Sequence, residues 1–277
     1  MSAQIHTRRT LAPQLRDIGL GTGDAVMVHA ALRSIGRILG GPDALIDALH
    51  DVIGPGGTVL VYTDWSDDYH DLLDDDGTVP ADLRDDIPPF DPAASRARRA
   101  NGAIAELVRT RPGARRSANP GASFAAVGGR AGWFTADHAL DYGYGEQSPF
   151  AKLAQVRGKV LMLGAPLDAM SLLHHAEHLA KIPGKRIVRT EVPILVEGRT
   201  VWRRFEEFDT SDPVVDGLPE GYFATVVEEF LATGRGTRGT VGEAASVLAP
   251  ATEMTDFAVR WLESRCGGRE PDGAPRR

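Results

Sequence analysis

The stretch GDAVMVHAALRSIGRILGGPDALIDALHDVIGPGGTVLVYTDW, residues 23–65, decides the fold class. Its two ends, residues 23–30 and 56–65, are short apolar runs with the composition of buried strands. Between them Leu45, Leu49 and Val52 recur at helical spacing, and Pro42 falls in the first turn of that predicted helix. A strand, helix and strand within about 40 residues has the length of a crossover unit, which predicts parallel strands.

The pattern continues along the rest of the chain. Further helices are predicted near residues 102–110, 148–156, 222–232 and 255–265, and further strands near 123–128 and 158–166. Residues 185–207 alternate around Glu197-Gly198, which predicts an antiparallel hairpin. The predicted fold is α/β, a mixed sheet with a parallel core flanked by helices plus a C-terminal β-hairpin. We expect one domain, residues 1–266, and a disordered tail, residues 267–277.

Composition narrows the class of protein. The chain has 277 residues, 42% of them hydrophobic and 25% charged, which is enough to bury a substantial core. It has no apolar run of about 18 residues and no apolar N-terminal segment, so we expect a soluble, cytoplasmic protein that does not bind a membrane. Its single cysteine, Cys266, rules out an internal disulfide framework and a thiolate zinc cluster.

Acidic residues gather in two windows. Residues 64–91 contain eleven aspartates and one arginine, and residues 206–220 contain six acidic residues and neither lysine nor arginine. Nucleic acid is therefore a poor candidate partner, because counterion release requires clustered cations. A polycationic small molecule is a good candidate, and two solvated acidic loops are the alternative.

Histidines gather in SLLHHAEHLAKIPGKR, residues 171–186, which holds His174, His175 and His178. His174, Glu177 and His178 share a helix face and match H-x-x-E-H, the pattern of a zinc hydrolase. Alternatively, His174 is a general base near Ser171, in the zone beyond a strand end where open α/β sheets place catalytic groups. A third interpretation is histidines packing on a half-buried helix. The chain has no G-x-S-x-G motif, which argues against an ordinary serine hydrolase.

Standard nucleotide-binding motifs are missing. Neither G-x-x-x-x-G-K-[ST] nor G-x-G-x-x-G after a predicted strand occurs. The turn LRSIGRILGG, residues 32–41, combines glycines with arginines and could hold a pyrophosphate, although a tight turn with solvated arginines fits equally well. A second cationic turn, residues 111–120, could also meet phosphate.

Nine blocks together resemble one family. In chain order they are MVHAALRSIG, IGPGGTVLVY, PPFDPA, PGARRSANPGASFAAVG, GEQSPFAKL, GKVLMLGAPLD, LLHHAEHLAKIPGKR, EEFD and GTVG. Their order and spacing resemble the aminoglycoside 3-N-acetyltransferase family over residues 6–267. The resemblance implies an antibiotic N-acetyltransferase-like fold, distinct from the GNAT acetyltransferases, whose Q/R-x-x-G-x-G/A signature is absent here. It also implies acetyl-CoA as donor, a 2-deoxystreptamine aminoglycoside acetylated on its 3-amino group as acceptor, antibiotic resistance as the outcome, and no metal.

The resemblance assigns roles to individual residues. His174 occupies the position of the active-site histidine, and Ser171 stands where threonine is usual. We expect His174 to be the general base, Ser171 to donate to the thioester carbonyl, and Glu207 to orient His174 or hold a substrate ammonium. Glu177 either contacts the substrate or fixes the His174 ring.

The remaining assignments concern the two ligands. Expected coenzyme A contacts are Ala31, Leu32, Arg33, Ser34, Ile35, Gly36, Ser117, Gln147 and Ser148, and expected substrate contacts are Asp64, Asp67, Asp68, Glu177 and Asp209. Two residues depart from the family pattern: Asn119 stands where histidine is normal, and Ala31 where serine is common. Acylation of another polyamine or sugar amine is the alternative activity. The protein is expected to be a monomer or a homodimer.

Overall fold

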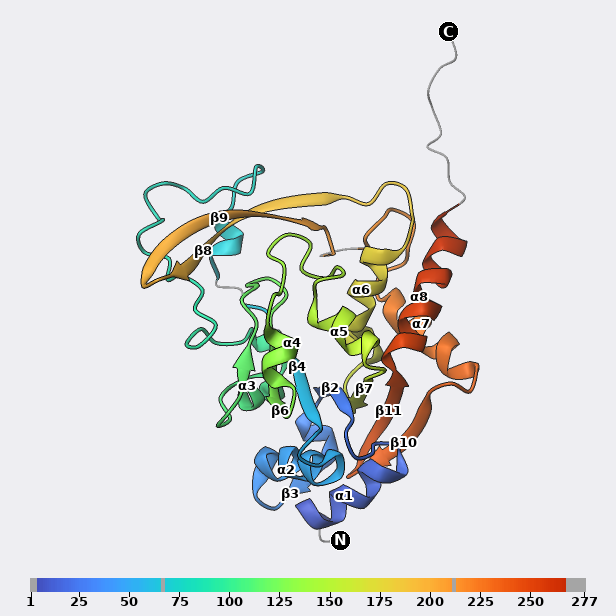
Figure 1. Ribbon diagram of the computed structural model, residues 1–277. Coiled ribbons are helices and arrows are strands. Elements are labelled where there is room, and N and C mark those ends of the chain that lie inside the picture. Colours follow the sequence, from blue (N-terminus) through green and yellow to red (C-terminus); the bar gives the residue numbers. More distant parts are fainter. Residues whose placement is uncertain (1–3, 66–67, 211–212, 268–277) are drawn as a thin grey trace.

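The fold is organised by one seven-stranded sheet, seen in a computed structural model that describes residues 4–65, 68–210 and 213–267 (Figure 1). Its strands, in spatial order, are β10 (Thr237–Val241), β11 (Ala244–Pro250), β7 (Lys159–Leu163), β2 (Ala25–Ala30), β4 (Thr58–Tyr62), β6 (Phe124–Gly128) and β5 (Arg115–Arg116). The helices are α1 (Arg8–Asp17), α2 (Gly41–Ile53), α3 (Ala103–Arg109), α4 (Ala131–Thr135), α5 (Pro149–Gln155), α6 (Leu172–Leu179), α7 (Tyr222–Ala232) and α8 (Ala251–Cys266).

The predicted parallel core is confirmed. β2 runs parallel to both β4 and β7, and α2 forms the crossover between β2 and β4. β6 and β11 pair antiparallel with the outer edges of this three-stranded core, so the sheet is mixed, as predicted. The β10–β11 hairpin was not predicted, because four of the five β10 residues are exposed and its sequence lacks the apolar alternation of a half-buried strand.

Side-chain alternation along the central strand divides the protein into two layers. Val26 and Val28 belong to a core shared with α1, α2 and α3. Met27 belongs to the opposite core, which contains residues of α5, α6, α7 and α8. Successive strand residues point to opposite faces, so a run buried on both sides becomes continuously apolar, as in AVMV.

The predicted hairpin projects from this body as β8 (Ile187–Val196) and β9 (Arg199–Phe208), the long curved arm in Figure 1. Glu197 and Gly198 at its turn have φ of 48° and 76°, the positive values that a tight hairpin turn requires. The aspartate-rich segment, residues 64–91, lies along β8, where the Phe90 N–H donates to the Pro193 carbonyl at 2.7 Å. A small core that includes Trp65, Phe90 and Val192 joins the two.

Short elements complete the fold. They are β1 (Ile5–His6), β3 (Arg37–Ile38) and the 3-10 helices η1 (Leu32–Ile35), η2 (Asp68–Leu72), η3 (Arg99–Asn101) and η4 (Leu167–Ala169). Within residues 4–65, 68–210 and 213–267, no helix combines the length and the apolar composition needed to span a bilayer. Most of the predicted tail, residues 268–277, lies outside the described residues.

Gly164, directly after β7, allows η1 to pack against the end of that strand. Its φ is +61°, and a Cβ at this position would lie 1.8 Å from Ser34 Oγ. We expect Gly164→Ala to destabilise the fold by about 2 kcal/mol or more, because backbone strain adds to overpacking. Thermal unfolding measures this effect. Gly56→Ala is the control, since a Cβ there meets nothing within 4 Å; equal melting temperatures of the two variants would refute the packing argument.

Candidate active site

A cavity of about 680 Å³ lies where the three parallel strands end. Its lining includes the residues that follow each of them: Ala31 after β2, Asp64 after β4 and Ala165 after β7. β2 has β4 on one side and β7 on the other, so the chain order reverses at β2 and opens a crevice at this edge. We call this space the main cavity.

Two further cavities adjoin it. One, of about 600 Å³, is lined by Glu220, Tyr222 and Phe223 and shares His174, Asp168 and Thr210 with the main cavity; we call it the side cavity. The other, of about 360 Å³, lies beneath β8 and β9 and is the hairpin cavity, lined among others by Asn119, Val188, Thr190, Val192, Phe205, Glu207 and Asp209. His174 therefore stands at a junction that two ligands can reach from different sides.

His174 is held by a buried carboxylate. Its Nδ1 lies 2.7 Å from Glu177 Oε2, one helical turn along α6, and Glu177 is only 2% exposed. Glu177 Oε1 accepts a further hydrogen bond from the Tyr222 hydroxyl. The His174 ring lies between Tyr144 and Phe223, with centroid distances of 5.0 and 4.9 Å. A proton on Nδ1 facing the carboxylate leaves Nε2 as the basic atom of the neutral ring.

The structure bears on two expectations about Glu177 and Glu207. Glu177, rather than Glu207, hydrogen-bonds the His174 ring. Both Glu177 oxygens are engaged by His174 and Tyr222, but Glu177 also lines the side cavity, so its contact with the substrate stays a prediction.

The zinc interpretation is not supported by the donor arrangement. His178 follows Glu177 in sequence, but its ring packs against Tyr142 and Phe208, with centroid distances of 5.8 and 5.4 Å. The Glu177 carboxylate is committed to hydrogen bonds inside the fold. Among the residues that the structure describes, no three His, Cys, Asp or Glu side chains are grouped so that they could hold a metal ion.

A second histidine also lines the main cavity. His29, near the end of β2, was not predicted as a site residue, because it sits within an otherwise apolar strand. Burial lowers its pKa to about 4, so the ring is neutral near pH 7. It can hydrogen-bond a ligand in the cavity, but no carboxylate among the described residues pairs with it as Glu177 pairs with His174.

Ser171 precedes α6 and lines the main cavity beside His174. It occupies the N-cap position, yet its side chain makes no capping hydrogen bond. The hydroxyl thus stands one turn before the His174 imidazole without being used by the helix terminus. This placement suits a donor to a ligand atom near His174.

Glu207 lies on β9 and faces the hairpin cavity. It accepts hydrogen bonds from the Phe208 N–H at 2.8 Å and the Tyr144 N–H at 3.4 Å. Burial nevertheless raises the pKa of Glu207 to about 7, since desolvation outweighs these bonds. Asp209 lines the same cavity and forms an ion pair with Arg186 at 3.3 Å.

Asp64, at the start of the aspartate-rich segment 64–91, lines the main cavity. Asp64 is 9% exposed, accepts a hydrogen bond from the Asn101 side-chain amide and lies 3.9 Å from an Arg98 nitrogen. Burial raises the pKa of Asp64. Asp67 lies outside the described residues, and Asp68 begins η2. The exposed Asp168, in the η4 turn between β7 and α6, reaches both the main and the side cavity and was not predicted.

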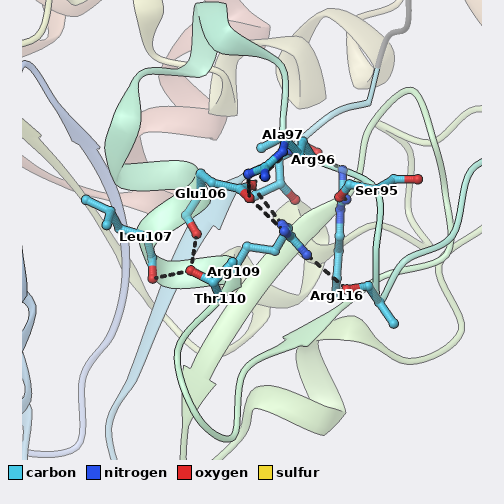
Figure 2. A network of polar contacts seen from close by, with 10 residues as sticks. Ser95, Arg96, Ala97, Glu106, Leu107, Arg109, Thr110 and Arg116 are labelled. Carbon is cyan, nitrogen blue, oxygen red and sulfur yellow. Dashed lines mark hydrogen bonds and ion pairs between the residues drawn. The ribbon is translucent and has the colours of Figure 1, made fainter.

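In the second cationic turn, residues 111–120, Arg116 is held inside the fold, whereas Arg115 is exposed and stays a candidate for phosphate contact. The Arg116 guanidinium donates to the Thr63 carbonyl, to the Ser95 carbonyl at 2.5 Å and to Ser123 Oγ at 3.0 Å, the first of these next to Asp64. Figure 2 shows this contact with Ser95 and the adjoining network, in which Arg109 donates to both oxygens of Glu106. These bonds anchor the segment that carries Arg98 and Asn101.

The expected coenzyme A contacts are brought only partly to the cavity. Ala31 lines it, Arg33 is exposed, and Ser34 Oγ donates to the Ala31 carbonyl at 2.7 Å in the η1 turn that ends at Gly36. Leu32 packs partly on the core, and Ile35 is fully buried in it, so its side chain is not a ligand contact.

Three of these expected contacts lie elsewhere. Ser117 and Ser148 are fully buried: Ser117 Oγ accepts the Phe124 N–H and lies 2.9 Å from His138 Nδ1, while Ser148 Oγ caps α5 by accepting the Ala151 N–H. Their hydroxyls therefore stabilise the fold, and the contact of these two residues with coenzyme A stays a prediction. Gln147 is exposed and does not appear in the lining of the three cavities.

Asn119, a departure from the family pattern, has a structural explanation. Its side-chain amide donates to the Ala139 and Leu140 carbonyls at 2.7 and 3.1 Å, and its Oδ1 accepts the Ala122 N–H. The residue is 4% exposed and ties two loops together at the floor of the hairpin cavity. An amide satisfies a donor and an acceptor role at once, which suits this position.

Comparison with known proteins gives the family. The model of the aminoglycoside 3-N-acetyltransferase family matches residues 27–263. The chain is 47% identical over 264 residues to aminoglycoside N(3)-acetyltransferase III of Pseudomonas aeruginosa, covering 95% of each protein. It is 45% identical over 273 residues to aminoglycoside N(3)-acetyltransferase VII of Streptomyces paromomycinus, covering 96% of this chain and 95% of that protein.

Solved structures agree with the sequence match. AAC-IIIb in a binary complex with CoASH superposes with a TM-score of 0.94 at 59% identity, covering 97% of this chain and 100% of that one. Sisomicin-bound AAC-VIa gives a TM-score of 0.90 at 38% identity, covering 96% of this chain and 100% of that one. The predicted fold is thus confirmed as that of these acetyltransferases, and the chain belongs to the aminoglycoside 3-N-acetyltransferase family.

Proposed function

We propose that the protein transfers an acetyl group from acetyl-CoA to the 3-amino group of a 2-deoxystreptamine aminoglycoside, which confers resistance to the antibiotic. The observation that carries this proposal is His174, fixed through Nδ1 by a buried Glu177 at the junction of two cavities. A base that two ligands reach from different sides suits direct transfer between them. The solved relatives that hold CoASH and sisomicin support this choice of ligands.

The chemistry starts at the acceptor amine. His174 Nε2 takes a proton from the amine as its nitrogen attacks the thioester carbonyl carbon. A C–N bond forms, and the carbonyl π electrons move onto oxygen, where the Ser171 hydroxyl donates a hydrogen bond. When the carbonyl reforms, the C–S bond breaks, and the thiolate leaves with a proton that the His174 imidazolium can supply. Glu177 stabilises that imidazolium. These reaction steps need neither a metal nor a covalent enzyme intermediate.

Electrostatics supports a polycationic acceptor. Asp64, Asp168, Glu207 and Asp209 line the three cavities around His174, so ammonium groups of an aminoglycoside meet carboxylates on several sides. The exposed Arg33 at the η1 turn is positioned to meet phosphate of coenzyme A outside the main cavity. Another polyamine or sugar amine would satisfy the same carboxylates. We further infer a cytoplasmic monomer or homodimer.

One experiment tests this function. The protein is incubated with acetyl-CoA and either sisomicin or gentamicin, thiol release is followed with a thiol-reactive dye, and the product is analysed by mass spectrometry and NMR. We expect one acetyl group on the 3-amino nitrogen. Turnover of a polyamine lacking 2-deoxystreptamine, with none of either drug, would assign the alternative acceptor class.

The binding of the acceptor should depend on the ionisation of Glu207. Because its carboxyl has a raised pKa of about 7, it is largely protonated at about pH 6 and ionised at about pH 8. The KM for the aminoglycoside should therefore fall as the pH rises through this range. In Glu207→Gln we expect a KM about tenfold higher at about pH 8 and little changed at about pH 6.

The control is Glu206→Gln, on the neighbouring β9 position, whose carboxylate pairs with Arg189 instead of lining the hairpin cavity. Its steady-state KM should follow the wild-type pH dependence. If Glu207→Gln retains that dependence as well, then Glu207 does not bind the acceptor.

A further inference from the structure

The structure extends the His174–Glu177 pair to a third residue on another helix. Glu177 uses Oε2 for His174, and its Oε1 accepts the hydroxyl hydrogen of Tyr222, which lies 45 residues further along the chain at the start of α7. Tyr222 is 5% exposed, so water does not compete freely for this bond. His174, Glu177 and Tyr222 thus form a continuous hydrogen-bonded line along the wall of the side cavity.

Packing fixes the position of the Tyr222 hydroxyl. Its ring stacks on Trp261 of α8 with a centroid distance of 5.8 Å and an interplanar angle of 11°. Trp261 is itself held by a hydrogen bond from its indole Nε1 to Glu229 at 2.8 Å. The next residue, Phe223, packs edge-on against the His174 ring. Helix α7 therefore places one residue behind the carboxylate and another beside the imidazole.

A buried carboxylate needs hydrogen-bond donors on both of its oxygens. If Oε1 lost its donor, the Glu177 carboxylate would be free to rotate away from Nδ1. Without that acceptor at Nδ1, the neutral ring can carry its proton on Nε2, which removes the lone pair that accepts the proton from the amine. The hydroxyl of Tyr222 opposes this rotation.

We propose that Tyr222 is a positioning residue, which keeps the Glu177 carboxylate aligned so that the basic lone pair of His174 stays on Nε2. This inference rests on the proposed function of His174. Tyr222 acts through Glu177 and does not touch the reacting atoms. Lys185 lies near Glu177, and Cys266 lies near Tyr222, so Lys185 and Cys266 are left unchanged in the test.

Tyr222→Phe is the decisive variant, because phenylalanine preserves the stacking on Trp261 and removes only the hydroxyl. We expect kcat to fall about 10- to 100-fold with both KM values within about twofold of wild type. Tyr142→Phe, which also removes a hydroxyl bonded to a carboxylate, Glu206, should keep kcat within about twofold of wild type.

A double-mutant cycle separates positioning from general destabilisation. In a Glu177→Gln background, Tyr222→Phe should change kcat by less than about twofold, since its effect passes through the carboxylate. An equal loss of kcat in both backgrounds would overturn the proposal. So would a wild-type kcat in the single variant.

A measurement without substrates distinguishes this idea from the proposed function. Nitrogen-15 NMR of the histidine rings reports the tautomer of His174 in the free protein. We expect the wild type to carry the neutral-ring proton on Nδ1 and Tyr222→Phe to shift the population toward Nε2. Identical spectra would overturn the role of Tyr222 even if the enzyme acetylates aminoglycosides. If Tyr222→Phe showed the expected tautomer shift but the wild-type protein had no transferase activity, only the proposed function would be refuted.

Discussion

Replacing His174 with alanine should lower the single-turnover rate of acetyl transfer by about 100-fold or more, because the attacking amine then loses its proton to water. His174 also lines both the main and the side cavity. Its removal should leave the dissociation constants of coenzyme A and aminoglycoside within a few-fold of wild type. Rapid-quench mass spectrometry gives the rate, and titration calorimetry gives both affinities.

His50→Ala is the matched control, since His50 lies in the last turn of α2 and does not line these cavities. It should transfer acetyl groups at the wild-type rate. A His174→Ala rate within about threefold of wild type, at saturating concentrations of both substrates, would remove His174 from the proton transfer.

The second large effect should come from Glu177. Glu177→Gln conserves the shape of the side chain but removes the charge that stabilises the His174 imidazolium, and its amide can donate to Nδ1 and select the wrong tautomer. Changing the analogous carboxylate of a serine protease triad costs about 10⁴-fold, so we expect a loss of kcat between about 100- and 10 000-fold. Steady-state kinetics measures it.

Glu206→Gln is the control for this change, because Glu206 also accepts a hydrogen bond from a tyrosine hydroxyl, that of Tyr142, but it lies on β9 and does not line the main or the side cavity. It should keep near-normal kcat. If Glu177→Gln also did so, while folding normally, the carboxylate would merely pack against α7.

Local patterns were sufficient to predict the parallel core and the position of His174. The apolar runs and the helix between them specify a crossover within one continuous segment, and β2 and β4 formed as that spacing predicted. His174 and Glu177 are three residues apart on α6, so helix geometry alone places them on one face. What the pattern left open was whether Glu177 binds substrate or orients the ring. The hydrogen bond between Glu177 and His174 favours the orienting role, and the substrate contact stays a prediction.

The parts that could not be predicted depend on contacts between distant segments. Tyr222 meets Glu177 only because α7 and α8 pack against α6 around Trp261. The family resemblance predicted coenzyme A contacts at Ser117 and Ser148, but it could not say that their hydroxyls face inward. Asp168 was not predicted, because a single carboxylate in a loop has no periodicity. Its place between two cavities is visible only in the structure, where η4 lines both of them.

The most direct measurement mixes the enzyme, acetyl-CoA and sisomicin in a rapid-quench instrument and follows the drug, the free thiol and the intact protein by mass spectrometry. Direct transfer with His174 as the base predicts that acetylated sisomicin and coenzyme A appear at one rate, that no acetylated protein accumulates, and that both products slow together in His174→Ala. Acetylated protein that forms before the drug is modified, or products formed by His174→Ala as fast as by the wild type, would contradict it.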